Sequence, residues 1–270
     1  MYLPNVKTGA ENPLTGPSPK EVPLHNAPLV RVIGQARFPL IAALGQQDSI
    51  APFQAAIGTE YPVLRREQTQ GLVIGPVGIA QSPQQIAWRF HSRDEHWRVS
   101  VAADFIALET TEYVSRKDFL RRLEAVLQAA DLHIKPSQID RLGLRYIDRI
   151  TGDALTDIGS LVRPEIRGIT GSEVSGHIQH ALSEAIFNLA ENQIAARWGH
   201  LPPNATVDPA AVEPVAVASW ILDLDMFSTV PFPFEVENTL EKAGDFAERI
   251  YALFRWAVTE EFLIRYGGEV

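Results

Sequence analysis

The sequence contains no cysteine and no long apolar run, and each absence excludes a class of protein or site. Without any Cys among its 270 residues, the chain cannot form disulfide bonds, thiol nucleophiles or thiolate metal sites. No run of about eighteen apolar residues occurs, so we expect no membrane-spanning helix. Residues 1–7 lack a basic region followed by an apolar core, so we expect no signal peptide and a cytoplasmic protein.

The chain also lacks a surplus of basic residues and the short motifs of common enzymes. It has 24 Lys and Arg against 33 Asp and Glu, a net charge of −9. Nonspecific nucleic-acid binders need a basic field, so this charge disfavours nucleic acid unless basic side chains gather on one face. No phosphate-binding glycine motif and no Gly-x-Ser-x-Gly elbow is present. These absences favour a binding or assembly protein over an enzyme.

Prolines divide the chain into an arm and a larger body. Most of the 19 prolines lie in the first forty residues and around 202–233. Residues 1–27 cannot hold a regular element for long, so we expect a flexible proline-rich arm. The remainder is predicted to form two α+β halves, 28–137 and 138–270, which could be one continuous domain.

Each half is predicted to run strand, short helix, three strands, helix. The first half has predicted strands over 29–38, 63–75, 85–92 and 97–108, a short helix over 50–58 capped by Ser49, and a helix capped by Ser115. The second half has a predicted strand over 141–150, a helical turn over 154–161, strands within 177–199 and over 219–226, and a helix over 235–266. We therefore predict an α+β fold, mainly antiparallel sheet, with two main helices packed on it. Segments 101–105 and 221–225 look alike, which favours an internal duplication.

Segment 177–199 fits a helix and a strand equally well by its apolar spacing. On a helix, His177, His180 and Glu184 would share a face and could hold zinc. On a strand, His177 and His180 would point to opposite faces and the zinc site would fail. The predicted repeat favours strands.

The most informative stretch is 141–150, which alternates as a strand does. Leu142, Leu144, Tyr146 and Ile150 would share one face. Arg141, Arg145 and Arg149 would line the other, where they must meet water or acidic partners.

Several segments of the chain together resemble a sporadically distributed family of uncharacterised prokaryotic proteins. The matching segments are Trp88-Arg89-Phe90, 104–110, Gly-Leu-Arg-Tyr-Ile-Asp-Arg-Ile at 143–150, Leu222-Asp223-Leu224-Asp225 and 258–262. They cover most of the chain beyond residue 28, and Gly-Leu-Arg-Tyr is the most specific. Asp148 stands where the resemblance leads us to expect Asn as readily. The family carries no agreed activity, so the resemblance implies a shared fold and no catalytic residues.

Arginines and aspartates are the candidate binding residues. Arg141, Arg145 and Arg149, with Arg31 and Arg37 on the strand over 29–38, could form a basic strip for phosphate or carboxylate. The alternative is that these arginines pair with acidic residues on neighbouring strands.

Asp223 and Asp225 project to one face of their strand. They are the expected salt-bridge partners of the arginines, and the alternative is that they bind a divalent metal or act in acid–base chemistry. A metal site usually needs a third ligand, for which Asp104, Glu109 and Glu184 are the only hints, and salt bridges to the arginines explain the aspartates more simply. We therefore expect no metal and no cofactor.

These observations favour a non-enzymatic binding or assembly module that associates with itself or with another protein. Arg255, Trp256, Phe262 and Tyr266, late in the last helix, are the expected contact face for a second copy. The alternatives are a nucleic-acid or nucleotide binder that uses the arginine-lined sheet face, and a metal-dependent hydrolase that uses Asp223 and Asp225.

Overall fold

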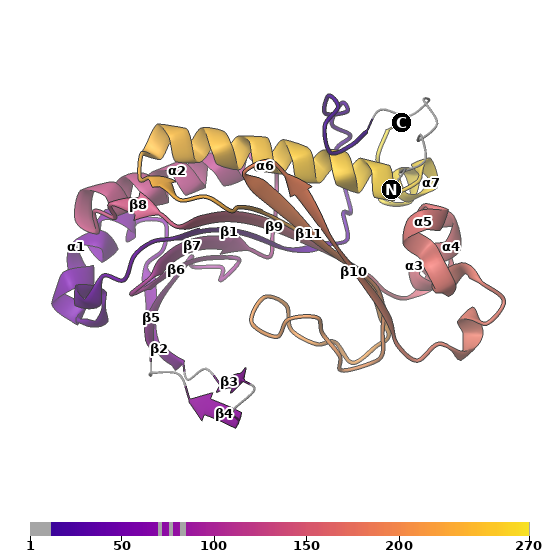
Figure 1. The fold of residues 1–270 in the computed structure, drawn as a ribbon, viewed down its shortest axis with the longest axis horizontal. Coiled ribbons are helices and arrows are strands. Elements are labelled where there is room, and N and C mark those ends of the chain that lie inside the picture. Colours follow the sequence, from indigo (N-terminus) through magenta and orange to yellow (C-terminus); the bar gives the residue numbers. More distant parts are fainter. Residues whose placement is uncertain (1–11, 70–71, 76–77, 82–84, 270) are drawn as a thin grey trace, which may run out of the picture.

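The computed structural model describes residues 12–69, 72–75, 78–81 and 85–269. Its centre is a nine-stranded antiparallel sheet in the order β10-β11-β12-β9-β1-β7-β6-β5-β2. Two helices, α2 and α6, lie side by side on one face, and the other face is open except for the loop between β11 and β12 (Figure 1). The predicted α+β fold with an antiparallel sheet and two main helices is confirmed.

The bounds of the elements are as follows. The strands of the large sheet are β1 (Leu29–Arg37), β2 (Val63–Thr69), β5 (Gln85–His91), β6 (Trp97–Ala102), β7 (Phe105–Thr110), β9 (Arg141–Ile150), β10 (Ala181–Leu189), β11 (Asn192–Leu201) and β12 (Ser219–Ser228). Two small ladders pair β3 (Leu72–Gly75) with β4 (Gly78–Gln81) and β8 (Gln138–Ile139) with β13 (Phe232–Pro233). The α-helices are α1 (Gln47–Ile57), α2 (Arg116–His133), α3 (Asp153–Thr156), α4 (Ile158–Leu161), α5 (Pro164–Arg167), α6 (Val236–Ala257) and α7 (Glu260–Arg265), and the 3₁₀ turns are η1 (Ala42–Gly45), η2 (Gly168–Gly171) and η3 (Ser175–His177).

The sheet is built from two similar halves that meet at β1 and β9. Outward from the centre, the order is β1-β7-β6-β5 on one side and β9-β12-β11-β10 on the other. The register of β1 and β9 is symmetric about the pair Val32↔Tyr146. If the two strands are interchanged, Arg31↔Ile147 takes the place of Ile33↔Arg145 and the reverse, while Val32↔Tyr146 stays in place. An approximate two-fold axis therefore passes through the sheet there, and residue n of β1 corresponds to residue n + 114 of β9.

The alternation of β9 divides its side chains between the two faces as expected. Leu142, Leu144 and Ile150 are at most 2% exposed and join the core beneath the helices. Burying each such side chain stabilises the fold by about 1.5–3 kcal/mol. On the open face, Ile147 and Ile221 form a smaller apolar cluster that the loop 202–218 covers.

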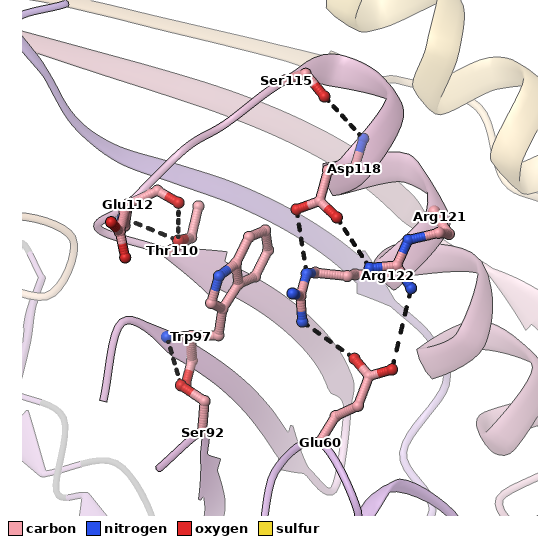
Figure 2. A network of polar contacts seen from close by, with 9 residues as sticks. All are labelled: Glu60, Ser92, Trp97, Thr110, Glu112, Ser115, Asp118, Arg121 and Arg122. Atoms are coloured by element: carbon pink, nitrogen blue, oxygen red, sulfur yellow. Dashed lines mark hydrogen bonds and ion pairs between the residues drawn. The ribbon is translucent and has the colours of Figure 1, made fainter. Parts of the chain in front are cut away.

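A network of polar contacts anchors α2 to the first half of the sheet (Figure 2). The Oγ of Ser115 accepts a hydrogen bond from the Asp118 amide at 3.1 Å, which confirms the predicted cap. Arg122 donates to Asp118 and to Glu60, at 3.2 and 3.1 Å, and its guanidinium lies 4.4 Å from the centre of the Trp97 ring. This arginine thus joins the helix, the end of α1 and the β5–β6 hairpin.

The predicted strand over 97–108 is wrong, because β6 ends at Ala102 and β7 begins at Phe105. Apolar alternation continues through the turn, so the sequence carries no break there. The reason for the turn is tertiary: the carbonyls of Ala103 and Asp104 accept hydrogen bonds from the chain that follows β1. Similarly, the predicted strand over 63–75 is divided between β2 and β3.

Two predicted helix boundaries also differ from the structure. The helix over 235–266 breaks after Ala257, since Val258 forms a β-bridge with Val162 and Thr259 caps the separate helix α7 through its Oγ1. Helix α1 begins at Gln47, so Ser49 lies inside it and is not its cap.

Residues 12–27 of the expected arm lie against α6. The guanidinium of Arg249 donates to the carbonyls of Pro13 and Gly16, both at 2.8 Å. The hydroxyl of Tyr251 accepts from the Val22 amide at 2.7 Å. Within the described part of the chain, no helix has both the length and the apolarity needed to cross a membrane.

Candidate functional site

A hollow of about 620 Å³ lies on the open face of the sheet, opposite α2 and α6. It spans both halves, and Ala210 and Ala211 from the loop 202–218 border it. Charged side chains dominate its lining: Arg37, Arg89, Arg98, Arg141, Arg145, Arg197, Glu109, Asp208 and Asp225. Six guanidinium groups therefore face three carboxylates around one space.

In the second half, Asp223 lies beneath the hollow between two arginines. Arg145 donates two hydrogen bonds to this carboxylate, of 2.7 and 2.8 Å, and a third to Asp208 at 2.7 Å. Burial opposes the charge of Arg145, but the bonds to Asp223 and Asp208 outweigh it and raise the pKa of the guanidinium. Arg197 lies on the other side, with its Nε 3.5 Å from Asp223 Oδ2. Only 1% of the Asp223 side chain is exposed.

The first half contains the same arrangement around Glu109. Arg98 grips Glu109 with bonds of 2.6 and 2.8 Å, and Arg31 donates to it at 3.2 Å. Burial again opposes the charge of Arg98, and the bonds to Glu109 outweigh it, so its pKa is raised. We call each Arg–carboxylate–Arg arrangement a bridge: Arg31–Glu109–Arg98 is the first bridge and Arg145–Asp223–Arg197 is the second bridge.

The two bridges occupy equivalent places in the sheet. Arg98 pairs directly with Glu109, as Arg197 does with Asp223. Arg31 and Arg145 each lie two residues before the central-strand partner of the carboxylate, which is Ile33 in one half and Ile147 in the other. Segment 107–111 therefore corresponds to 221–225. The likeness within the sequence had instead matched 101–105 to 221–225.

Arg141 and Asp225 form a further ion pair at 2.9 Å. The guanidinium of Arg141 also lies 4.1 Å from the centre of the Phe227 ring. Burial raises the pKa of Asp225, and the charges of Arg141 and Arg145 only partly offset this. This carboxylate is therefore less strongly ionised than a surface aspartate.

Arg37 and Arg197 have the most unused hydrogen-bonding capacity in the hollow. Arg37 is exposed, and among the described residues its side chain donates a hydrogen bond only to Gln35, at 3.4 Å. The Nε of Arg197 is buried, and no described atom accepts a hydrogen bond from it. The two side chains line the hollow from opposite halves, and 25% of the Arg197 side chain is exposed although its Nε is not. They are therefore the candidates to contact an anion that enters the hollow.

The predicted site residues separate into three groups. Arg37, Arg141, Arg145 and Asp225 line the hollow. Arg31 and Asp223 belong to the bridges beside and beneath it. Arg149 lies outside the lining, where it donates to the Glu213 carbonyl at 2.7 Å and where burial lowers its pKa.

The basic strip that was predicted from the sequence did not include Arg89, Arg98 and Arg197. Each adjoins a tryptophan: Trp88, Trp97 and Trp198. Trp88 and Trp97 are buried on the helix side, so strand alternation directs the adjacent arginines to the open face. Asp208, in a loop, carried no comparable signal.

The zinc alternative fails because 177–199 is not helical. Glu184 lies on strand β10, as the strand interpretation predicted, but that strand begins at Ala181 and His177 instead ends the 3₁₀ turn η3. In the part of the chain that the structure describes, no group of three or more His, Asp or Glu side chains could hold a metal ion. Asp223 and Asp225 instead contact Arg145 and Arg141.

No protein-family model matches this chain, and no curated protein matches it either.

Proposed function

We propose that the protein is a binding module that takes an anionic ligand, one carrying phosphate or carboxylate groups, in the hollow of the open sheet face. The observation that carries this proposal is the convergence of six arginines, from strands β1, β5, β6, β9 and β11, on one space. Arginine presents a planar fork that suits phosphate and carboxylate oxygens.

The charges around the hollow support an anion over a cation. Six arginines line it against Glu109, Asp208 and Asp225, and adding Asp223 beneath still leaves the arginines in excess. The lining residues therefore carry a charge of the opposite sign to the net charge of −9 for the chain, while Glu67 and Glu184 pair with Arg89 and Arg197 from outside the lining. An anion would find donors already held in place by the bridges, so few side chains would need to be ordered on binding.

The size of the hollow supports a small ligand of nucleotide size. Its volume of about 620 Å³ lies within the range of about 300–1,000 Å³ that is usual for small-molecule sites. Trp88 and Trp97 are buried on the other face, so they cannot stack on a ligand in the hollow.

Calorimetric titration with ADP and with inorganic pyrophosphate at low salt tests the proposal. We expect binding that weakens as salt rises, because each neutralised phosphate releases counterions. The double substitution Arg37→Ala and Arg197→Ala should weaken binding at least about tenfold, on the scale of two lost charge-assisted bonds. Arg93→Ala, an exposed arginine in the β5–β6 turn, is the matched control. If neither probe binds at low salt, or if the double variant binds as the parent does, the proposal fails.

Self-association is a second candidate, favoured by the exposed edge strand β10. This nine-residue strand ends the large sheet, and Leu182 and Ile186 on it are 41% and 59% exposed. A long edge with apolar side chains is a template for pairing with another strand. The contact face expected late in the last helix is a poorer candidate, because Phe262 is only 1% exposed.

Light scattering on the intact chain tests this candidate. We expect a dimer that Ile186→Lys dissociates, while Ile264→Lys, at a 64% exposed position on α7, leaves it intact. A strict monomer at high concentration would remove the candidate. The two equivalent bridges also support the expectation that the halves arose by duplication.

A further inference from the structure

A second cavity, of about 240 Å³, lies on the helix side of the sheet. Its walls come from β9, from β12, from α6 and from the segment 21–29 that crosses beside α6. It is separate from the arginine-lined hollow, since the sheet lies between them. Most of its lining is apolar, with Leu24, Leu29, Leu224 and Ile250 among the wall residues.

A single carboxylate without a partner lines this cavity. Asp148 is 7% exposed. Among the described residues, its carboxylate has no side-chain hydrogen bond or ion pair, and burial alone shifts its pKa. The one cation at the cavity wall, Arg116, is already paired with Glu21 and with Glu248, the latter at 2.9 Å. A buried carboxylate normally has a partner, because its desolvation otherwise costs several kcal/mol. A cation or a strong hydrogen-bond donor that enters the cavity would supply such a partner.

Aromatic rings line the same space. They are Tyr113, Tyr146, Tyr251 and Phe254, and the rings of Tyr113 and Tyr146 meet edge to face with centroids 5.6 Å apart. The negative faces of such rings attract organic cations, and a set of them around an acidic group is the usual surrounding of a bound ammonium ion. An apolar wall, several rings and one free carboxylate thus fit one class of ligand.

We propose that this cavity binds a small organic ammonium ion, whose charged nitrogen pairs with Asp148 and whose apolar body lies against the rings and α6. Its volume suits a ligand of about ten non-hydrogen atoms. The proposal does not depend on the anion site, because the two spaces share no lining residue.

The protonation state of Asp148 provides a second way to test the site. Burial raises the pKa of its carboxyl to about 7. The titratable or charged groups around the cavity are Glu21, Tyr113, Arg116, Tyr146, Tyr251 and, at the end of α7, Tyr266. Burial raises the pKa of Tyr113 and of Tyr146, so both stay neutral at physiological pH. Asp148 is thus the group at this cavity whose raised pKa lies close to neutrality.

Titration of the intact chain with 2-phenylethylammonium, against the neutral 2-phenylethanol of the same size, tests the proposal. The ammonium should bind about tenfold or more tightly than the alcohol at pH 8. Its affinity should fall about thirtyfold between pH 8.5 and pH 5.5, because only the ionised carboxylate attracts it and that form is then a few per cent of the total. The alcohol should show no such dependence.

Asp148→Asn should remove the preference for the ammonium, while Asp131→Asn, at an exposed aspartate on α2, should keep it. If Asp148→Asn does not fold, amide NMR of the parent protein decides the matter, since the ammonium should shift the resonances of Leu29, Leu224 and Ala247. Shifts elsewhere, no binding of the ammonium at pH 8, or equal affinity for the two probes would overturn the proposal.

Discussion

In the first half of the sheet the outer arginine, Arg98, grips the buried carboxylate, whereas in the second half the central arginine, Arg145, does so. The positions are equivalent, but the hydrogen bonds are distributed differently. Glu109 takes two bonds from Arg98 and one from Arg31. Asp223 takes its two bonds from Arg145 and leaves the Nε of Arg197 without an acceptor. Each bridge leaves one buried donor without an acceptor among the described residues, the Nε of Arg31 in the first bridge and the Nε of Arg197 in the second. The two bridges therefore differ in which arginine holds the carboxylate with two hydrogen bonds.

The halves differ on the helix side as well. Asp148 corresponds to Gly34 through the register of β1 and β9. A Cβ at Gly34 would lie 3.2 Å from the Phe119 ring, so an aromatic side chain of α2 fills the space on that side. In the second half the corresponding space remains a cavity beside a carboxylate. The first half is therefore closed on its helix side, whereas the second half has the cavity beside Asp148 there. The hollow on the open face, by contrast, takes arginines from both halves.

Neutralising either bridge carboxylate should lower the unfolding free energy more than the other substitutions do. The loss should be larger for Asp223 than for Glu109. Asp223→Asn would leave Arg145 facing the hollow with only Asp208, and Arg145 is 12% exposed. Removing one partner of a buried ion pair costs about 3–5 kcal/mol of unfolding free energy. Glu109→Gln should cost less, because 25% of the Arg98 side chain reaches solvent and water can replace the lost partner. Urea denaturation of both variants measures the difference, and equal losses would contradict it.

The next largest difference between the halves should be the pH dependence of the unfolding free energy, which we expect to arise from the second half. Burial raises the pKa of Asp148 to about 7, well above its usual value. The folded state then binds more protons than the unfolded state between about pH 4 and 7, so this contribution is present below pH 4 and is lost as the pH rises through 7. The loss amounts to at most about 4 kcal/mol at pH 8.

Asp148→Asn should remove this dependence and raise the unfolding free energy at pH 8, measured by urea denaturation from pH 5 to 8. Gly34, the equivalent position, has no titratable group, so Asp131→Asn on α2 is the better control and should follow the parent curve. A parent curve that is flat between pH 5 and 8 would show that Asp148 is already ionised or has found a partner.

Most of what could be predicted from the sequence came from the alternation of polar and apolar side chains along the strands. It separated Arg141 and Arg145 from Leu142 and Leu144 because a strand's side chains alternate regardless of its neighbours. Alternation also made Asp223 and Asp225 the expected partners of the arginines, and the structure has both in ion pairs. It could not say that Arg145 meets Asp223 and Arg141 meets Asp225, because that matching depends on cross-strand register. The turn at 103–104 was missed for a similar reason, since its support comes from the distant chain after β1. The cavity beside Asp148 depends on how α6 packs, which no local pattern contains.

A smaller effect should follow from adding one methyl group at the closed half. Gly34→Ala would place a Cβ 3.2 Å from the Phe119 ring, which must then move by a few tenths of an ångström. Overpacking of this kind costs about 1–3 kcal/mol. Gly45→Ala is the control, because a Cβ there meets no atom within 4 Å. Thermal unfolding should show a lower midpoint for the first variant alone, and an unchanged midpoint would mean that the helix side of the first half is looser than the contacts indicate.

The smallest expected difference lies at the starts of the two main helices. Ser115 caps α2 with a hydrogen bond to the Asp118 amide, whereas Glu235, at the start of α6, makes no side-chain cap bond. Ser115→Ala should cost about 1 kcal/mol, because an amide of the first turn loses its acceptor. Glu235→Ser should gain up to about the same amount, since α6 lacks that bond at present. Opposite signs in urea denaturation would show that the capping of the two halves is unequal, while a loss from both substitutions would show that Glu235 stabilises α6 through its charge at the positive end of the helix.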